Sequence, residues 1–468
     1  MINHLKDDTI AAISTAPGVG GIAVIRISGN QSIEIVSSIF KANKKDVEIK
    51  TASAYQAIYG TIYECEEEID KVVVSLFRAP HSFTGEDVVE ISCHGSIYIQ
   101  QRILSLLINK GCRLATAGEF TQRAFFNGKM DLSQAEAVAD LINSQTKAAH
   151  SVALNQMKGT FSNKLSLLRE KLLHLVSLLE LELDFGDHEE LEFADRKELI
   201  QISTELYNEI KKLTSSFSTG NAIKNGIPVS IIGNTNVGKS TLLNHLIGEE
   251  KAIVSDIPGT TRDIIEDVVN INGISFRFID TAGIRSTNDT IEKIGIERSY
   301  NAINHSQIVI WVIDGSNYEI EKINDIKQYL LESGKIIITV INKIDIATQQ
   351  QLDTIKLHLS DTLNNILLIS AKKEQYIEEL TNLLYEKAGI SEDINNDIIV
   401  NNVRHYEALQ HSLESIERII EGLNNNIPSD FIAQDARETI HYLSEITGGE
   451  ITTPEVLSNI FSKFCIGK

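Results

Sequence analysis

The amino-acid sequence predicts a multidomain α/β and α protein, with an N-terminal α+β domain, a helical domain, and an α/β domain inserted into the helical one. Three observations predict this architecture. The length of 468 residues exceeds that of one domain, which averages roughly 150 residues. Short strand-like runs near the start give way to the three- and four-residue periodicity of helices. Alternating strands and helices then interrupt that periodicity, which returns afterwards.

The N-terminal region reads as short apolar runs separated by glycine, proline and serine, a pattern typical of strands and turns. We expect strands at residues 21–26, 54–59, 72–77 and 88–92, followed by a helix at 98–109. An α+β domain over residues 1–118 follows from this pattern.

Leucines at helical spacing dominate the next region and predict long amphipathic helices between residues 134 and 213. The leucines that show the spacing best are Leu165, Leu168, Leu172, Leu175 and Leu179. The acidic run Asp184 to Glu192 is expected to be a solvated loop. Helical spacing returns at residues 405–420 and 431–446, with Pro428 before the second helix, and a final helix is expected from about Thr453.

The intervening region alternates apolar strands with helical segments, which predicts a parallel sheet wrapped by helices. Its expected strands are residues 228–232, 275–279, 309–313, 336–341 and 366–369. Because helical segments precede and follow it, we expect an inserted domain. The expected domains are 1–118 at the N-terminus, 119–220 and 389–468 for the two parts of the helical domain, and 221–388 for the insertion.

Composition narrows the class of protein. The chain has 43 basic and 64 acidic side chains, a net charge of −21 that repels phosphate backbones, so a nucleic-acid substrate would be held largely by a partner. No apolar run is long enough for a membrane span, and no apolar signal core opens the chain, so a cytoplasmic location is expected. The four cysteines, Cys65, Cys93, Cys112 and Cys465, are too sparse for a disulfide or zinc framework.

A phosphate-binding motif lies in the inserted domain. Residues Gly233 to Ser240 match G-x-x-x-x-G-K-[ST], follow an expected strand and open an expected helix at 241–247. Main-chain N–H groups of such a loop cradle phosphates, Lys239 neutralises the outer ones, and the Ser240 hydroxyl suits Mg²⁺. Alone, the motif indicates a nucleoside triphosphate.

Two further motifs specify guanine. Asp280-Thr281-Ala282-Gly283 and Asn342-Lys343-Ile344-Asp345 each end an expected strand. The Asp345 carboxylate suits the paired N1–H and 2-amino donors of guanine, whereas adenine would set an acceptor against a buried charge. GTP is therefore preferred over ATP, and this excludes an ATP-dependent kinase.

Other residues suit the same nucleotide. Asp280 suits a water-mediated Mg²⁺ contact and the Gly283 N–H suits the γ-phosphate. Ser370-Ala371-Lys372 resembles the loop that presents an N–H to the guanine carbonyl. Ras-like GTPases place a water-orienting Gln directly after Asp-x-x-Gly, but Ile284 stands here, so another group must orient water. The switch-like segment 253–263 holds candidates.

Three motifs outside this core are Ser82 to Asp87, Gly118 to Asn127, and the terminal Phe464-Cys-Ile-Gly-Lys468. With these motifs the chain resembles the MnmE (TrmE) family of tRNA-modification GTPases, from the first strand to the last residue. The resemblance implies a homodimer, an N-terminal domain that binds a tetrahydrofolate derivative, and a Ras-like doubly wound G domain inserted in a helical domain.

The resemblance also implies roles in GTP hydrolysis that K⁺ activates as two G domains dimerise. Asn236, Ser255, Ile257 and Thr260 match positions that ligate K⁺, and Thr261 joins Ser240 at Mg²⁺. Glu292 falls where the family has the acid that positions the attacking water through a second water, beside the catalytic Lys239 and Gly283. The full nucleotide and cation set is Asn236, Val237, Gly238, Lys239, Ser240, Thr241, Ser255, Asp256, Ile257, Pro258, Gly259, Thr260, Thr261, Asp280, Thr281, Ala282, Gly283, Asn342, Lys343, Asp345, Ser370 and Ala371.

For the folate, Arg26, Glu90, Lys129 and Lys468 match family contact positions. A pterin offers an N–H and 2-amino donor pair that a carboxylate such as Glu90 accepts, while Arg26 and the lysines suit the glutamyl carboxylates. Cys465 is open to two interpretations: a partly ionised thiol near Lys468, or a small apolar residue packing against the final helix.

The function that the resemblance implies is the addition of an aminomethyl or carboxymethylaminomethyl group at C5 of the wobble uridine of certain tRNAs. An FAD- and NADH-using partner of the MnmG type would join the chain in a heterotetramer. Methylene-tetrahydrofolate would supply one carbon, and glycine or ammonium the nitrogen. The alternative is a regulatory GTPase switch of the ribosome-assembly type, without modification chemistry of its own.

Overall fold

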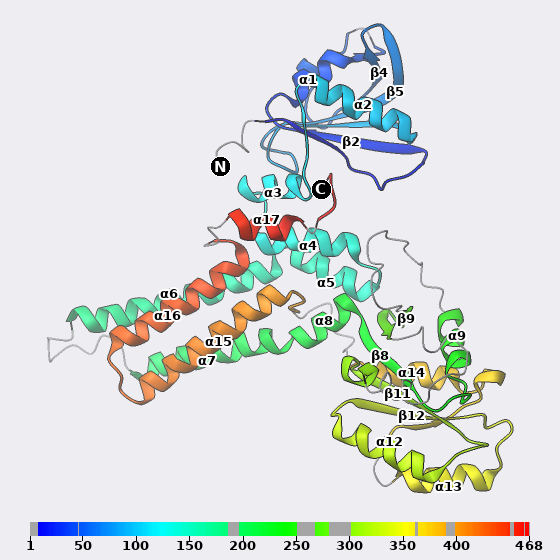
Figure 1. Cartoon of the computed structure of the whole chain (residues 1–468). Coiled ribbons are helices and arrows are strands. Elements are labelled where there is room, and N and C mark those ends of the chain that lie inside the picture. The colour runs from blue at the N-terminus through cyan, green and yellow to red at the C-terminus, as the bar shows by residue number, and fades with distance from the viewer. Residues whose placement is uncertain are drawn as a thin grey trace. The chain divides into compact units, whose positions relative to one another are not determined.

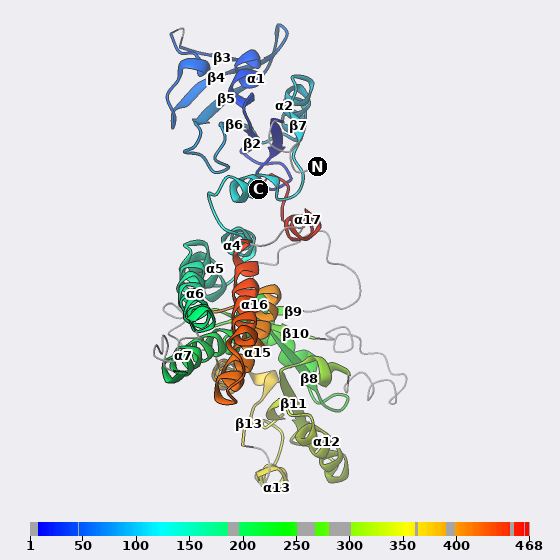
Figure 2. The ribbon, with the colours of Figure 1, turned by 90° about the vertical axis from the view of Figure 1, so that its left-hand side faces the viewer.

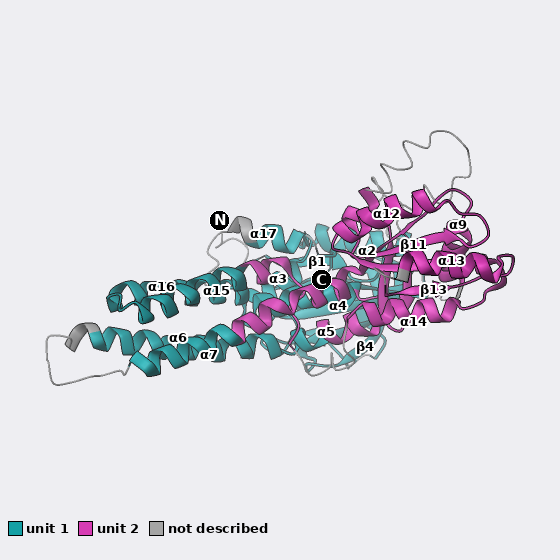
Figure 3. Ribbon diagram, turned by 90° about the horizontal axis from the view of Figure 1, so that it is seen from below, with its two compact units in different colours: residues 1–143, 154–208, 408–468 teal, residues 144–153, 209–407 magenta. Residues whose placement is uncertain are grey.

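The structure is a computed structural model that describes residues 8–44, 46–185, 196–249, 267–279, 301–360, 364–389, 398–449, 454–462 and 464–467. The chain divides into two compact units, coloured separately in Figure 3. Unit 1 comprises residues 1–143, 154–208 and 408–468, and unit 2 comprises residues 144–153 and 209–407.

Unit 1 begins with a seven-stranded sheet in the order β3-β4-β5-β6-β2-β1-β7. Its strands are β1 (Ile10–Ile13), β2 (Ile22–Ser28), β3 (Phe40–Ala42), β4 (Ala57–Glu64), β5 (Glu67–Phe77), β6 (Val88–His94) and β7 (Arg113–Leu114). All neighbours are antiparallel except β1 and β7, which are parallel. The four strands expected from the sequence are confirmed, and the short β1, β3 and β7 were not expected.

Helices α1 (Ser32–Ile39) and α2 (Ile97–Asn109) cover one face of this sheet, and a 3-10 turn, η2 (Ile49–Thr51), precedes β4 (Figures 1 and 2). Alternate strand residues such as Ile25 and Ile91 are fully buried in this core. Side chains between them, including Arg26 and Glu90, point to the opposite face, as the period of two requires. The core face is therefore structural and the open face carries polar groups.

The rest of unit 1 is helical. The helices wholly or partly in this unit are α3 (Glu119–Phe126), α4 (Leu132–Asn143), α5 (Lys147–Met157), α6 (Thr160–Phe185), α7 (Arg196–Ser215), α15 (Val403–Asn424), α16 (Ser429–Thr447) and α17 (Pro454–Ser462). The five leucines singled out on α6 are at most 2% exposed, and α6 lies along α16 (Figure 1). The expected amphipathic helices are confirmed. Most of the acidic run 184–192 lies outside the described residues.

Unit 2 contains a six-stranded sheet in the order β13-β12-β11-β8-β10-β9. The strands are β8 (Ile227–Ile232), β9 (Asp267–Ile271), β10 (Ile274–Phe278), β11 (Ile308–Asp314), β12 (Ile336–Asn342) and β13 (Ile366–Leu368). The five expected strands are confirmed. They are parallel to one another, as predicted, and β9 is an additional antiparallel edge strand that a tight turn joins to β10.

Helices cover both faces of this second sheet. They include α8 (Phe217–Asn225), α9 (Lys239–Glu249), α12 (Ile320–Glu332), α13 (Gln349–Ser360), the short η3 (Ala371–Lys373) and α14 (Ile377–Lys387). All residues of the central β11 are buried, with Ile310 in the core on one face and Trp311 in the core on the other. This is the doubly wound arrangement, whose ligand sites lie at the carboxyl ends of the parallel strands.

None of the helices within the described ranges combines the length and the apolar character that a membrane span requires.

Candidate functional site

The phosphate loop of unit 2 follows β8 and leads into α9, as the motif predicts. Gly233, Asn236 and Gly238 all have positive φ, at 145°, 61° and 102°. A Cβ on Gly233 would lie 2.2 Å from the Val312 carbonyl oxygen, and one on Gly238 would lie 2.3 Å from Asn342 Nδ2. Both glycines are therefore required by the close approach of neighbouring strand ends.

The loop places its polar groups at the start of α9. Lys239 Nζ donates hydrogen bonds of 2.7 Å to the carbonyl oxygens of Gly233 and Asn234, and burial lowers the pKa of its ammonium group. Ser240 and Thr241 follow in the first turn of the helix, whose N-terminal N–H groups favour anions. Val237 is buried, whereas the Asn236 side chain is exposed.

The guanine motif ends β12 and connects to the phosphate loop. Asn342 is 2% exposed, and its Nδ2 donates to the Val237 carbonyl oxygen at 2.8 Å. Its Oδ1 accepts from the Ala371 N–H at 2.9 Å. Ser370 donates from Oγ to Asp345 Oδ1 at 2.7 Å. The structure therefore brings together the phosphate loop and the two loops that the sequence assigns to guanine.

Asp314, at the end of β11, is a residue of this site that the sequence did not reveal. Its Oδ2 lies 2.6 Å from Lys343 Nζ, and its Oδ1 accepts from the N–H and the hydroxyl of Ser316. Burial alone would raise the pKa of Asp314, but the hydrogen bonds from Lys343 and Ser316 outweigh it and lower the pKa. Lys343 has a positive φ of 66°. The sequence feature that could have identified Asp314 is an acidic residue at the end of a strongly apolar strand.

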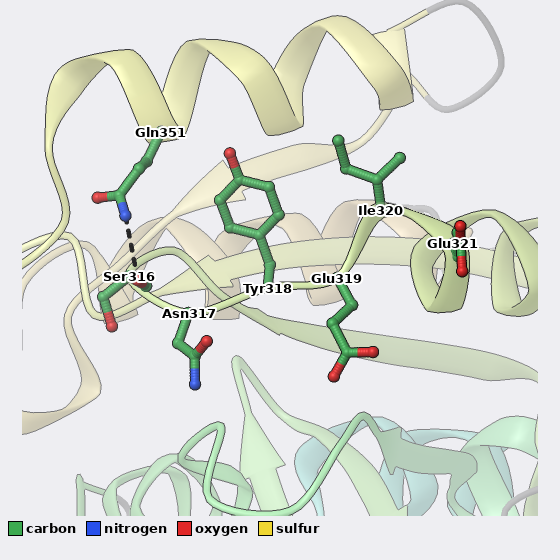
Figure 4. Close-up of a pocket in the computed structure, with 7 residues that line it drawn as sticks. All are labelled: Ser316, Asn317, Tyr318, Glu319, Ile320, Glu321 and Gln351. Atoms are coloured by element: carbon green, nitrogen blue, oxygen red, sulfur yellow. Dashed lines mark hydrogen bonds between the residues drawn. The ribbon is translucent and has the colours of Figure 1, made fainter.

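A pocket of about 590 Å³ lies beside this site, around the loop between β11 and α12 (Figure 4). Gln351 on α13 donates to the Ser316 carbonyl oxygen at 3.1 Å across one side of it. The lining residues are Ser316, Asn317, Tyr318, Glu319, Ile320, Glu321 and Gln351. None of the sequence-predicted nucleotide residues is among them.

Several predicted residues lie outside the described part of the chain. They are Ser255, Asp256, Ile257, Pro258, Gly259, Thr260, Thr261, Asp280, Thr281, Ala282, Gly283, Glu292 and Lys468. Their roles with Mg²⁺, K⁺, water and folate stay predictions.

A second polar site occupies the open face of the N-terminal sheet. Arg26 on β2 pairs across the strands with Glu90 on β6, and Arg26 Nε and Nη2 lie 2.9 and 2.8 Å from Glu90 Oε1. The guanidinium lies 5.5 Å from the ring centre of Phe83 and 5.7 Å from that of Phe120. Aromatic faces and a carboxylate therefore hold this cation in place.

The C-terminal segment docks beside the Arg26 guanidinium. The Gly467 carbonyl oxygen accepts from Ser14 Oγ at 3.0 Å and from Arg26 Nη1 at 3.5 Å, and the Gly118 N–H donates to the Cys465 carbonyl oxygen at 3.3 Å. A Cβ on Gly467 would lie 2.4 Å from the Ile13 carbonyl oxygen, so only glycine permits this approach. The Cys465 side chain is exposed.

The motifs Ser82 to Asp87 and Gly118 to Asn127 contact each other. Arg123 Nη1 lies 3.1 Å from Glu86 Oε2, and Asn127 Nδ2 donates to the Thr84 carbonyl oxygen at 2.7 Å. Lys129 donates to the Pro80 carbonyl oxygen at 3.0 Å. Lys129 therefore braces the loop that carries the Ser82 to Asp87 motif.

A buried carboxylate completes this network. Glu119 is 1% exposed and pairs with Arg113 and with Arg123, whose Nη2 is 3.2 Å from Glu119 Oε1. Burial alone would raise the pKa of Glu119. Hydrogen bonds from Arg113 and the Thr116 N–H outweigh burial and hold that pKa below its usual range. The network therefore contains charged groups that depend on one another.

A doubly wound sheet with a glycine-rich phosphate loop after one strand and Asn-Lys-x-Asp after another defines a GTP-binding P-loop domain. The family model described as "MnmE helical domain" matches residues 132–465, and "GTP-binding protein TrmE N-terminus" matches residues 9–129. The chain therefore belongs to the MnmE family of tRNA modification GTPases, and it is a GTP hydrolase that acts in tRNA modification.

Two relatives are similar to this chain over nearly its full length. The "tRNA modification GTPase MnmE" of Parabacteroides distasonis is 56% identical, covering 98% of this chain and 100% of the relative. The protein of the same name from Bacteroides thetaiotaomicron is 52% identical, over 99% and 100%. A solved GTP-binding protein from Sulfolobus solfataricus in complex with GDP is 22% identical over 47% of this chain and 67% of its own, with a TM-score of 0.27.

Proposed function

We propose that this GTPase is activated by K⁺ and works with an FAD-dependent partner of the MnmG type. Together they add an aminomethyl or carboxymethylaminomethyl group at C5 of the wobble uridine of certain tRNAs. A tetrahydrofolate derivative on the N-terminal domain supplies the one-carbon unit. The proposal includes a homodimer, Mg²⁺ at the nucleotide, and a cytoplasmic location.

The observation that carries the proposal is the Arg26–Glu90 pair with the C-terminal segment docked against it. Both contacts to Arg26 fall on Glu90 Oε1, and within the described residues no side chain or N–H donates to Oε2. The Glu90 side chain is 24% exposed, so Oε2 is available as an acceptor. A reduced pterin presents an N–H and an amino donor, so the residues present fit it.

Each residue has a defined part in binding. Arg26 orients the Glu90 carboxylate, because the donors of a guanidinium are fixed in a plane. The Gly467 carbonyl oxygen lies beside the same guanidinium, and Lys468 follows Gly467 in the sequence. When bound, the folate supplies a one-carbon unit for transfer.

The nucleotide site supports the GTPase part of the proposal. Lys239 and the main-chain N–H groups at the start of α9 offset phosphate charge, and Ser370 keeps the Asp345 carboxylate in place for guanine. Asn236 has a left-handed backbone conformation and an exposed side chain. This exposure supports its proposed role as a K⁺ ligand. Ser255, Ile257 and Thr260 complete the proposed K⁺ site, and Ser240 and Thr261 hold Mg²⁺.

The acidity of the chain supports a division of the tRNA contacts between this chain and its partner. A net charge of −21 disfavours phosphate contacts over most of the surface. In the proposal, the partner therefore makes most of the tRNA contacts. The rival function, a regulatory switch of the ribosome-assembly type, gives no role to the Arg26–Glu90 site.

The test is GTP turnover by the purified chain in KCl and in NaCl at equal ionic strength, with ATP as a parallel substrate. Faster turnover in KCl, with GTP only, supports the K⁺ site. Equal rates in both salts leave a GTPase and remove the proposed activation. Wobble-uridine analysis of tRNA from a deletion strain then separates the two functions, because a switch without chemistry leaves the modification in place.

A further inference from the structure

Asp70 and His94 form a pair on the N-terminal sheet that neither the nucleotide site nor the folate site uses. His94 Nδ1 lies 2.7 Å from Asp70 Oδ1, and the His94 main-chain N–H donates to Asp70 Oδ2 at 2.8 Å. The Lys71 N–H also donates to Oδ1, at 2.9 Å. Because a carboxylate only accepts, His94 Nδ1 donates this hydrogen bond, and in the neutral tautomer that does so Nε2 is an acceptor.

The two side chains differ sharply in exposure. The Asp70 side chain is 8% exposed and the His94 side chain is 67% exposed. The carboxylate is therefore shielded from water with both oxygens bonded, while the ring opens to the solvent. A buried acid that orients an exposed imidazole is the arrangement of a general base, whereas a histidine serving only the core has its ring buried and both nitrogens bonded.

The pair is connected to the folate site along one strand. Glu90 and His94 lie four residues apart on β6 and belong to the same alternation, with Ser92 between them. At about 3.3 Å per residue, their Cα atoms are roughly 13 Å apart. The residues that face Ser92 across the strands are Val24 on β2 and Val73 on β5. Short side chains therefore separate the two polar pairs, and a ligand with two linked ring systems can reach both.

A glycine-rich loop, residues 14–21, connects the same two places. Ser14, at one end, donates to the Gly467 carbonyl oxygen beside Arg26. Gly20, near the other end, donates to the Gly95 carbonyl oxygen at 3.1 Å, directly after His94. A Cβ on Gly95 would lie 2.3 Å from the Gly20 oxygen, so the main chain beside His94 is closely packed. The main chain that carries the His94 imidazole is therefore fixed by these contacts.

We propose that His94, oriented by Asp70, is a catalytic residue that transfers the proton in the one-carbon step. The proposal rests on the proposed folate function. In that step an amine forms a carbon–nitrogen bond to the one-carbon unit, and one carbon–nitrogen bond to the pterin carrier breaks. His94 Nε2 takes the proton that the amine loses and gives it to the carrier nitrogen that leaves. Asp70 neutralises the imidazolium between the two transfers. No oxidant or reductant takes part.

The test compares the full-length chain with His94→Ala and Asp70→Asn. His174→Ala, which alters an exposed histidine on α6 of the same unit, is the matched control. Three quantities are measured for each: binding of 5-formyltetrahydrofolate by equilibrium dialysis, GTP turnover, and the rate of wobble-uridine modification in the reaction reconstituted with the FAD-dependent partner. Free imidazole is then added to His94→Ala, whose exposed site admits it.

We expect His94→Ala to retain folate binding and GTP turnover and to lose modification by about 100-fold, within the range for a general acid–base group. Asp70→Asn loses less, and added imidazole restores part of the His94→Ala rate. Unchanged modification, or a loss that imidazole does not restore, overturns proton transfer by His94. Loss of folate binding in His94→Ala also overturns it and makes His94 a binding residue. If the wild-type chain does not bind the folate, the proposed function itself fails.

Discussion

The Asn342 side-chain amide donates to the Val237 main-chain carbonyl oxygen at 2.8 Å, so the last residue of β12 holds the phosphate loop directly. The same amide accepts from the Ala371 N–H at 2.9 Å. A single buried side chain therefore fixes the phosphate loop relative to the loop that follows β13. Through this side chain, the loops assigned to guanine are held in a fixed position relative to the loop assigned to the phosphates.

Replacing Asn342 by Ala is expected to weaken GDP binding by more than about tenfold. The Val237 oxygen and the Ala371 N–H would each lose a partner in a buried place, at about 1–3 kcal/mol each, and about 1.4 kcal/mol corresponds to tenfold in affinity. Isothermal titration with GDP measures the change. Asn301→Ala, at an exposed position of the same unit, is the control and should bind as the wild type does. Equal affinities of the two variants would contradict the role of Asn342.

Gly220→Ala is expected to destabilise unit 2. A Cβ at this position on α8 would lie 2.1 Å from the Val400 carbonyl oxygen, and Ser216 Oγ, one turn earlier, accepts from the Val400 N–H at 3.0 Å. The two main chains would have to separate, at about 1–3 kcal/mol for overpacking. Urea unfolding followed by fluorescence of Trp311, the one tryptophan of the chain and 1% exposed, reports on this unit.

The matched control for this prediction is Gly248→Ala. This helical glycine on α9 has nothing within 4 Å of its Cβ position. Alanine there should stabilise the unit by about 0.5–1 kcal/mol, because it restricts the unfolded chain. The two substitutions are therefore expected to have opposite signs, and destabilisation by neither or by both would argue against the close contact at Gly220.

Glu119→Gln is expected to destabilise unit 1 at neutral pH and much less in acid. The substitution removes one charged partner from Arg113 and from the buried Arg123, while Asp8 still pairs with both and Glu86 with Arg123. The cost should therefore stay below the roughly 3–5 kcal/mol of breaking a buried pair completely. Because the pKa of Glu119 is lowered in the folded chain, its contribution is complete above the unfolded value and is lost as the pH falls through the folded one. The difference from wild type should therefore shrink below about pH 4.

Hydrogen exchange of the α3 amides between pH 7 and the acid range measures this difference. The control is Glu205→Gln, which removes the charge from a half-exposed contact of 3.3 Å to Lys171 and should change stability little at pH 7, because water screens exposed ion pairs. A gap between Glu119→Gln and wild type that stays constant with pH would show that the carboxylate charge is not what stabilises the network.

Local patterns in the sequence predicted much of the fold and of the nucleotide site. The phosphate loop and Asn-Lys-x-Asp could be placed because each directly follows a strand with a strong apolar signal. Helix α1 was not expected, because Ile33 and Ile35 alternate with polar residues as in a strand. Strand β9 was not expected, because as an edge strand it buries only Val269 and Ile271.

Contacts between distant residues could not be predicted in the same way. Arg123 and Glu86 belong to two separate motifs, and only the folded chain shows that one motif binds the other. Ser14 and Gly467 are 453 positions apart. The Asp70–His94 pair depends on the strand register, which single-sequence patterns do not specify.

Glu90→Ala is expected to reduce binding of 5-formyltetrahydrofolate by about 10- to 100-fold. Hydrogen bonds to a charged group contribute about 1.5–3 kcal/mol, and the change removes the Oε2 acceptor as well as the partner of Arg26. Equilibrium dialysis measures the binding. Glu68→Ala, at an exposed position on β5, should bind as the wild type does, and GTP turnover should be the same in all three proteins. Unaltered binding in Glu90→Ala would remove the assignment.

Glu292→Ala is expected to retain GTP binding and nearly stop hydrolysis. Ile284 stands where Ras-like GTPases carry the water-orienting glutamine, so the water must be oriented by another group, and the family resemblance assigns this to Glu292. Loss of a group that acts only in the transition state lowers turnover and leaves ground-state binding unchanged. Nucleotide affinity and single-turnover rates in KCl separate the two effects. Glu332→Ala, at an exposed position on α12, is the control. Turnover in Glu292→Ala equal to that of the control would assign the water to a residue of the 253–263 segment instead.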